Sequence, residues 1–376
     1  MSTPHEVDNP PQEPISALCF SPDSSRLAVA SWNRDVSIYD NTASPDIFSF
    51  SGRRIQYRAP VLDVCWGGDS ETLYTVGTDW DVRRVDISQA ADDGAEGQGT
   101  QLILSTHEAP SNKIAYSPSY GLIISTSWDA TMHVHDVSNG KFFRVKLAAK
   151  PFALNLSPDK AVIAMAERKV SVYDLSALRT LVEQVGVDDN GMGSNPAENV
   201  FEGGSPWQQR ESSLKFMTRA VACMPDGSGF ATSSIEGRVA VEWFDPEAQS
   251  KTYAFKCHRQ TVSAPADENG EETELDVVYP VNTLAFHPVH GTFATGGGDG
   301  VVSVWDANTK RRVRQYQNMG ASVASIAFSP DGEFMAVGIS PGYEDGQESE
   351  QEAVGGSIKI VVRRLAGNEV KGRPGK

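Results

Sequence analysis

The stretch 254–259, "AFKCHR", brings one thiol and three basic side chains together. Cys257 lies between Lys256 and His258, and Arg259 follows. Cations on both sides lower the pKa of a cysteine, so this spacing could produce a reactive thiolate. Strand alternation, however, places Cys257 on the face opposite Lys256 and His258, where a thiol serves as a small apolar core residue. We prefer this second interpretation, which leaves the cations to bind an anion.

Other stretches with possible chemistry have simpler explanations. The glycine run 296–300, "GGGDG", could cradle a phosphate, but it also fits a tight turn between two strands, and we prefer the turn. His287 and His290 could ligate a metal, but no cysteine or carboxylate is near them in the sequence. The sequence contains no G-x-S-x-G, H-E-x-x-H, Walker or paired-cysteine motif. We therefore expect a binding protein and not an enzyme, without cofactor or metal.

The charge balance restricts the partners. The chain has 33 basic and 49 acidic residues and a formal net charge of −16. Coating of nucleic acid needs clustered Lys and Arg that release counterions, so direct nucleic-acid binding is not expected. The start of the chain lacks an apolar signal segment, and no apolar run reaches the ~20 residues of a membrane span. We expect a protein of the nucleus or cytosol with no membrane partner.

Seven segments of the sequence share one pattern. Each has a short apolar strand, a turn rich in Pro, Asp and Gly, a second strand of small and β-branched residues, a polar turn, and a third strand that ends near an Asp. The segments cover 15–40, 61–87, 112–137, 151–175, 218–245, 281–306 and 322–362. Their period resembles that of WD-repeat propellers, in which each blade buries its faces against its neighbours. We predict an all-β fold, one seven-bladed WD-repeat β-propeller over residues 1–376.

Closing such a ring needs one more strand, because an open ring would expose unpaired strand edges. We predict that residues 3–8 supply the outer strand of the last blade. Three further segments, 182–204, 260–276 and 341–356, are acidic and rich in glycine and have little apolar periodicity. We expect them to be acidic surface loops.

Basic residues gather in and around the fifth repeat. "QQRESSLKF" (208–216) precedes this repeat and is expected to form an outer strand, "SSIEGRVAVE" (233–242) spans a turn, and "AFKCHR" follows. Arginine forks bind phosphate and carboxylate groups in pairs of hydrogen bonds, so one patch could hold acidic or phosphorylated peptides. The alternative is that the arginines pair with the nearby Glu211, Glu236 and Glu242. The proposed patch consists of Arg210, Lys215, Arg238, Lys256 and Arg259.

Two tryptophans add a second signal. Trp32 and Trp128 occupy matching polar turns of the first and third repeats, and Trp80 lies nearby in the second. A polar turn is an unusual place for a core indole, and Trp and Arg dominate binding hot spots. We expect Trp32 and Trp128 to anchor a peptide beside the basic patch.

The stretches "QRESSLKF", "SSIEGRVAVEWFDP" and "YAFKCHR" resemble the all-propeller, WD-repeat branch of the budding-uninhibited-by-benzimidazole family of spindle-assembly-checkpoint proteins. A sister family, the WD-repeat RNA-export factors of the nuclear pore, shares "SIEGRVA" and "FKCHR". "RESSLK" favours the checkpoint branch.

The resemblance implies a mitotic adaptor of the nucleus and kinetochore with two kinds of peptide partner. GLEBS segments of a checkpoint kinase and of its kinase-like relative would lie across one face. Trp32, Trp128, Arg210, Lys215 and Arg259 would contact them. A phosphothreonine of MELT-type repeats in a kinetochore scaffold would bind Arg238 and Lys256, beside Trp32.

Two rivals remain open. An export factor would bind a nucleoporin GLEBS segment and messenger RNA. A generic scaffold would show no preference for phosphate. The first repeat departs from the checkpoint pattern, since "SWNRD" stands where Trp is usually followed by Asp, and Arg34 could therefore join the peptide site. The 341–356 segment also differs in length and charge, which leaves contacts of the seventh blade open.

Overall fold

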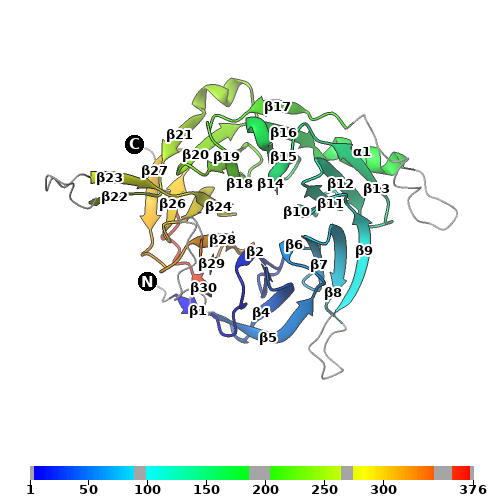
Figure 1. Ribbon diagram of the computed structural model, residues 1–376, viewed down its shortest axis with the longest axis horizontal. Coiled ribbons are helices and arrows are strands. Elements are labelled where there is room, and N and C mark those ends of the chain that lie inside the picture. The colour runs from blue at the N-terminus through cyan, green and yellow to red at the C-terminus, as the bar shows by residue number, and fades with distance from the viewer. Residues whose placement is uncertain (1–3, 89–98, 186–203, 264–273, 343–357, 373–376) are drawn as a thin grey trace, which may run out of the picture.

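Seven four-stranded antiparallel sheets form a closed ring in the computed structural model (Figure 1). The structure describes residues 4–88, 99–185, 204–263, 274–342 and 358–372. Each sheet is one blade, and its first strand lies innermost. The predicted all-β, seven-bladed WD-repeat propeller is confirmed.

The blades follow the chain in order. Blade 1 contains β2 (Ile15–Phe20), β3 (Arg26–Ser31), β4 (Asp35–Ser44) and β5 (Ile47–Gln56), and blade 2 contains β6 (Val61–Trp66), β7 (Thr72–Gly77), β8 (Asp81–Asp86) and β9 (Thr100–Thr106). Blade 3 contains β10 (Ser111–Ser117), β11 (Leu122–Ser127), β12 (Thr131–Asp136) and β13 (Phe142–Lys146), and blade 4 contains β14 (Pro151–Leu156), β15 (Lys160–Met165), β16 (Lys169–Asp174) and β17 (Gln208–Glu211). Blade 5 contains β18 (Thr218–Cys223), β19 (Gly229–Ser234), β20 (Arg238–Trp243) and β21 (Tyr253–Lys256), and blade 6 contains β24 (Val281–Phe286), β25 (Thr292–Gly297), β26 (Val302–Asp306) and β27 (Arg311–Gln315). Blade 7 contains β28 (Val323–Phe328), β29 (Phe334–Ile339), β30 (Lys359–Arg364) and β1 (His5–Glu6).

The second strand of each blade is the most deeply buried. All six residues of β11, for example, are buried, and the same holds for β7, β15, β19, β25 and β29. Small and β-branched side chains suit this position, because both faces of the strand pack against neighbouring blades. The repeated composition of the sequence therefore reflects burial on two sides.

The Asp that closes each repeat has a local structural role. In the third strands, Asp86 accepts hydrogen bonds from the backbone and hydroxyl of Ser88, and Asp136 does the same with Ser138. Such contacts two residues ahead are Asx turns, which fix the start of a connection. They also hold the pKa of Asp86 below its usual value. The repeated Asp is thus a turn residue.

The N-terminal segment closes the ring, as predicted. His5 and Glu6 pair with Val362 and Val361 of β30, and the Val7 amide donates to the carbonyl of Ile360 at 2.9 Å. Val7 is buried in a cluster between blades 7 and 1. The chain start therefore protects the outer edge of the last blade.

The three predicted acidic loops fall largely outside the described residues. The structure differs from the expectation at 260–276, because β22 (Arg259–Ser263) and β23 (Glu274–Val278) form an antiparallel hairpin. Val262 and Leu275 pair across it, and this apolar cross-strand contact favours strands over a loop. At 182–204 the first residues belong to α1 (Leu175–Gln184), which Asp174 caps by accepting from the amides of Ser176 and Ala177. Residues 343–356 of the third segment lie outside the described residues.

Two short 3-10 turns complete the inventory, η1 (Ala166–Arg168) and η2 (Glu247–Lys251). Within the described parts of the chain, no helix combines the length and the apolar character that crossing a bilayer requires.

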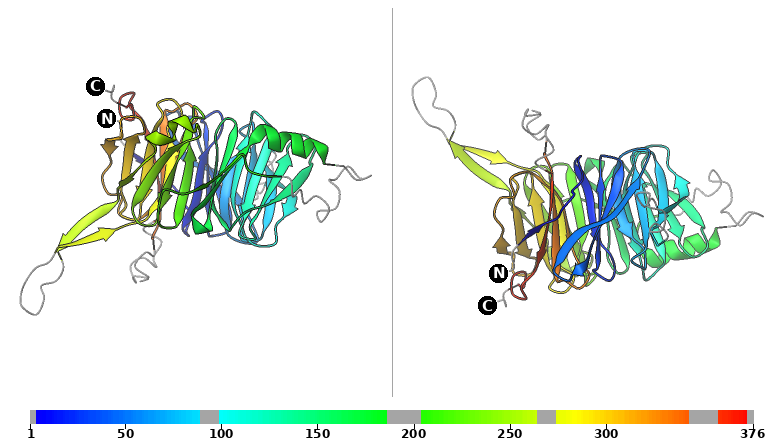
Figure 2. Two further views of the ribbon diagram at one scale, coloured as in Figure 1. Left: turned by 90° about the horizontal axis from the view of Figure 1, so that it is seen from above. Right: turned by 90° about the horizontal axis from the view of Figure 1, so that it is seen from below.

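The antiparallel order defines two faces of the ring. The turns between the second and third strands lie on the same face as the connections from one blade to the next, and we call this the top face. The turns at Trp32 and Trp128 and the hairpin β22–β23 belong to it. The other turns, with α1 and η2, lie on the bottom face. Figure 2 shows the hairpin and α1 on opposite sides of the ring.

Candidate peptide-binding site

Arg238 and Lys256 lie directly opposite each other at the top edge of blade 5. Arg238 begins β20, Lys256 ends β21, and the two residues pair in the antiparallel register. Side chains at opposed positions have Cβ atoms about 5 Å apart, so both cations can reach one anion. The Lys256 side chain is exposed, and that of Arg238 is 35% exposed.

Glu236 lies beside this pair. Its carboxylate Oε1 is 3.2 Å from Nε of Arg238, and its backbone carbonyl accepts a hydrogen bond from Arg259 at 2.9 Å. The following Gly237 has φ +63°, and a Cβ there would lie 2.7 Å from the carbonyl of Cys257. Only glycine therefore lets this turn approach "AFKCHR" so closely. The carboxylate pairing that the sequence left open is therefore present for Arg238, and it is present for Arg210 as well, whose Nη1 lies 3.8 Å from Oε2 of Glu242.

Cys257 and His258 point into the protein. Cys257 is buried, and burial raises the pKa of its thiol to about 12, which excludes a thiolate at neutral pH. His258 was expected on the same side as Lys256, but its backbone leaves the strand with φ +50° and its ring is buried. Nδ1 contacts Asp299 and Nε2 contacts Thr295, each at 2.8 Å. The cations available on "AFKCHR" are thus Lys256 and Arg259.

Trp32 and Trp128 are exposed on the top face, as the sequence predicts. They are 47% and 38% exposed, and their backbone amides make equivalent hydrogen bonds to Pro14 and Pro110 at 3.0 Å. The ammonium of Lys150 lies 4.5 Å from the centre of the Trp128 ring, which is a cation–π contact. These indoles are therefore exposed on the same face as the Arg238–Lys256 pair.

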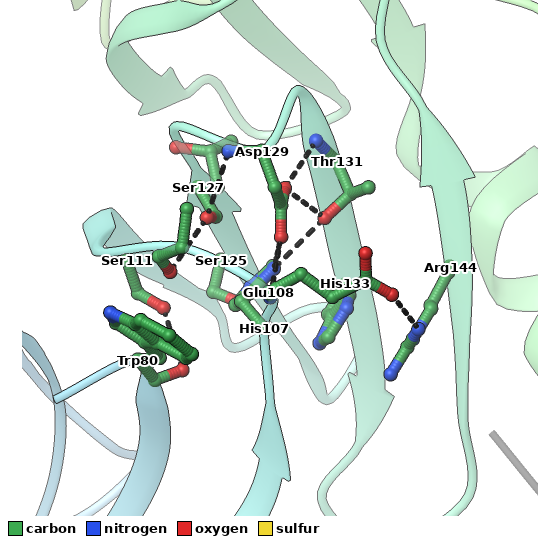
Figure 3. Close-up of polar contacts among 12 residues, drawn as sticks. Trp80, His107, Glu108, Ser111, Ser125, Ser127, Asp129, Thr131, His133 and Arg144 are labelled. Carbon is green, nitrogen blue, oxygen red and sulfur yellow. Dashed lines mark hydrogen bonds and ion pairs between the residues drawn. The ribbon is translucent and has the colours of Figure 1, made fainter.

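A buried polar network supports the turn of Trp128 (Figure 3). Asp129, the next residue, accepts from the amide and hydroxyl of Thr131 at 2.8 and 2.6 Å and from the amide of Glu108 at 2.8 Å. His107 lies 3.5 Å from the same carboxylate, and Ser111 donates to the carbonyl of Trp80 at 2.9 Å. Contacts to Asp129 hold the pKa of its carboxyl well below the usual range, chiefly through side-chain hydrogen bonds that outweigh desolvation by burial. The network fixes the backbone from which the indole projects.

Arg210 does not lie with the other cations. Its guanidinium donates to the carbonyls of Trp243 and Phe244 at 2.8 and 3.0 Å and to the side chain of Gln208. Because Trp243 ends β20 and Arg238 begins it, Arg210 sits at the opposite end of that strand. Burial lowers the pKa of Arg210, and the side chain is only 12% exposed. We therefore correct the expected patch by removing Arg210 from it.

Lys215 and Arg259 remain on the top face. Lys215 lies in the connection from blade 4 to blade 5 and is exposed next to Phe216 and Met217, which are 52% and 44% exposed. Arg259 begins β22 and is half-buried. Apolar and basic side chains thus alternate along the blade 5 side of the top face.

Arg219 is a residue that the sequence interpretation missed. The pairing of first and second strands contains a β-bulge in all seven blades. Five of the bulged residues line the central channel, and the other two, Leu62 and Asn112, line a smaller cavity that Phe152 and Arg219 also border. The seven bulged residues are Ser16, Leu62, Asn112, Phe152, Arg219, Asn282 and Ala324. Arg219 is the one cation among them, which an alignment of the repeats would have revealed.

Arg219 also joins the two tryptophans in space. A cavity of about 200 Å³ is lined by Trp128, Phe152, Met217 and Arg219, among others. The channel, with a volume of about 690 Å³, is bordered by both Trp32 and Arg219. Arg219 thus borders the channel together with Trp32 and the smaller cavity together with Trp128, and apolar and cationic side chains of this kind fit a peptide with apolar and acidic residues.

Comparisons with known proteins agree with this architecture. The family model "WD domain, G-beta repeat" matches residues 5–40, 99–136 and 277–306. The chain is similar to "Mitotic checkpoint protein BUB3.1" of Arabidopsis thaliana, with 37% identity over 99% of this chain and 96% of that protein. It is similar to "Mitotic checkpoint protein bub-3" of Caenorhabditis elegans, with 32% identity over 92% and 90%. It is also similar to "Poly(A)+ RNA export protein" of Schizosaccharomyces pombe, with 30% identity over 99% and 93%. With a ring of seven WD-type blades and this similarity along almost its entire length, the chain belongs to the WD-repeat family of BUB3 mitotic checkpoint proteins, which has the RNA-export factors as its sister branch.

Proposed function

We propose that the protein is a non-catalytic adaptor that recruits checkpoint kinases to kinetochores in the nucleus. One part of the top face binds GLEBS segments of a checkpoint kinase and its kinase-like relative. Another part binds phosphothreonine in MELT-type repeats of a kinetochore scaffold. The observation that carries the proposal is the direct cross-strand pairing of Arg238 with Lys256.

The chemistry of phosphothreonine suits this pair. A phosphate adds about −1.5 to −2 charges and three strong acceptor oxygens, so it can bond to two cations at once. The contact between Arg238 and Glu236 competes with it, but a single partly exposed ion pair contributes little, about 0–1 kcal/mol. A dianion that reaches both Arg238 and Lys256 should therefore displace the carboxylate. An unmodified threonine offers no such gain.

The mouth of the channel suits the GLEBS segment. Trp128, Phe152 and Met217 supply the apolar part of the cavity lining, and Arg219 borders the cavity with a guanidinium. Glutamates of the segment would bond to Arg219 and Arg259, in place of the Arg210 that the resemblance had suggested. Charge-assisted pairs of this kind are the stronger hydrogen bonds.

A titration with synthetic peptides tests the proposal. The protein is titrated with a MELT-type peptide in phosphorylated and unmodified forms, and separately with a GLEBS peptide, by calorimetry. We expect the phosphorylated form to bind at least tenfold more tightly, with an advantage that shrinks as salt is added. Equal affinity for both forms would reject the phosphate clamp.

The RNA-export reading is the second candidate, and the similarity to the export protein of Schizosaccharomyces pombe favours it. Such a protein would bind a nucleoporin GLEBS segment and RNA. Retention of single-stranded RNA at physiological salt separates the two functions. With a net charge of −16, we expect the protein not to retain it.

A further inference from the structure

The outer strand of blade 2 differs from every other outer strand of the ring. β9 has the sequence "TQLILST" and contains no charged residue. The other six outer strands each contain at least one, among them Arg53 and Arg54 in β5, Arg144 and Lys146 in β13, Glu211 in β17, Lys256 in β21, Arg311 in β27 and Glu6 in β1. Charges on an edge strand prevent unwanted pairing with other chains. β9 lacks this protection.

The unprotected strand is also apolar and exposed. Leu102 and Ile103 are 57% and 52% exposed, on consecutive positions that point to opposite faces of the sheet. β9 pairs only with β8 within its sheet, so its second edge is free in the described structure. Figure 1 shows β9 on the outer circumference of the ring.

The order of residues in β9 is almost the same in both directions. Around Ile103, Leu102 matches Leu104, Gln101 matches Ser105 and Thr100 matches Thr106. β9 has a β-bulge at Leu104, since Ile103 pairs with Arg83 and Ser105 with Val82 of β8. Two copies of the strand in antiparallel orientation bring the two Ile103 side chains together and place each Leu102 beside a Leu104 at this bulge. A twofold axis requires a surface that complements itself in this way.

We propose that β9 pairs with β9 of a second copy of this chain, in antiparallel register centred on Ile103. The two blades then form one continuous sheet across a twofold axis. Seven residues bury less than the ~800 Å² per partner of a standard interface, so the dimer is weak, with a Kd on the order of 10⁻⁵ M. This site is separate from the top face and does not depend on the peptides proposed above.

Charge gives this contact a distinct salt dependence. Each copy has a net charge of −16. Added salt screens repulsion between the copies while it leaves the apolar contact intact, so the dimer should strengthen. Phosphopeptide binding on the top face should weaken under the same change.

Sedimentation of the full chain over a concentration series tests the proposal, with Ile103→Lys as the disruptive variant. We expect a concentration-dependent dimer for the native protein and a monomer for the variant. Gln315→Lys, which adds the same charge to the exposed end of β27, is the matched control and should still dimerise. A native protein that stays monomeric above the expected Kd, or an Ile103→Lys variant that dimerises equally, overturns the proposal and leaves the edge to a different partner strand.

Cysteine cross-linking tests the register without a disruptive charge. Thr100→Cys/Thr106→Cys should form intermolecular disulfides under mild oxidation, because the two positions face each other across the axis. Thr100→Cys alone should not, since its counterpart is then Thr106. Equal cross-linking by the single and double variants contradicts the register.

Discussion

Arg210 and Arg238 lie near opposite ends of the same strand and have opposite roles. Arg238 begins β20, is partly exposed, and has one carboxylate contact through Glu236. Arg210 comes from β17 of the neighbouring blade, and its guanidinium donates hydrogen bonds to backbone carbonyls at the end of β20 and to Gln208. The first is available to a ligand, whereas the second connects two blades.

The difference shows what makes a cation functional in this ring. A guanidinium has five N–H donors, and a partner can use only those that the protein has not already satisfied. At the interface of blades 4 and 5 the donors of Arg210 are satisfied by the carbonyls of Trp243 and Phe244 and by Gln208. On the top face, strand ends project beyond the packed sheets and leave donors free.

Removal of both Arg238 and Lys256 should have the largest effect on phosphopeptide affinity. Arg238→Ala/Lys256→Ala removes two charge-assisted contacts, each contributing about 1.5–3 kcal/mol, so phosphopeptide affinity should fall on the order of 100-fold or more. The melting curve should change little, because both side chains are at the surface. Calorimetry with the phosphorylated MELT-type peptide measures the loss.

A matched control removes two cations from the bottom face. Lys251→Ala/Arg311→Ala changes the net charge equally, and both residues are exposed. If this variant loses phosphopeptide binding as strongly as the clamp variant, general charge and not the Arg238–Lys256 pair determines affinity.

Substitution of Arg210 should lower stability and leave peptide affinity unchanged. Arg210→Ala leaves the carbonyls of Trp243 and Phe244 and the side chain of Gln208 without this donor, which should lower the free energy of unfolding by roughly 2–3 kcal/mol. Peptide affinity at a temperature where the variant is folded should be unchanged. Urea unfolding and calorimetry on the same sample measure the two quantities. A stable variant with weakened GLEBS binding would return Arg210 to the binding site.

Three buried histidines make their contacts inside the protein, as Arg210 does. His107 and His133 stack with ring centres 3.5 Å apart, and Ser105 contacts both His133 and His135 at 2.9 Å. Burial lowers the pKa of all three, to about 3 for His135. The unfolded chain therefore takes up protons near pH 6.5 while the folded protein does not, so stability should decrease as the pH falls below ~6.5.

The slope of this decrease is about 1.4 kcal/mol per pH unit for each histidine. Urea unfolding at several pH values between 7.5 and 5 measures it. His135→Phe should reduce the slope by about one proton, whatever it does to the absolute stability. An unchanged slope would mean that His135 is protonated in the folded protein.

Substitution of Lys215 should have the smallest effect on peptide binding. It is a single exposed cation on a flexible side chain, so Lys215→Ala should weaken GLEBS binding by at most ~1 kcal/mol, about fivefold. Calorimetry with the GLEBS peptide measures it against the native protein. A larger loss would identify Lys215 as a main anchor of the peptide.

The parts of the fold that repeat were predictable from the sequence, and so were residues whose role is local. The seven-blade pattern, the closing strand at the N-terminus and the exposure of Trp32 and Trp128 follow from periodicity and turn chemistry. The position of the His258 ring was not predictable, because a single positive φ turns it inward towards Asp299 and Thr295, 41 and 37 residues away. The hairpin β22–β23 was also missed, because the acidic and glycine-rich composition of the segment favoured a loop and the pairing of Val262 with Leu275 leaves no local pattern.

By itself, the amino-acid order determined which elements form, because strand alternation, Asx turns and glycine positions act over a few residues. Only the tertiary structure decided which cations can bind a ligand, because the groups that accept hydrogen bonds from a guanidinium can come from another blade. Arg210 meets carbonyls more than 30 residues away, while Arg219 and Trp128 line one cavity from different blades. Closure of the ring creates both encounters, and no local pattern records them.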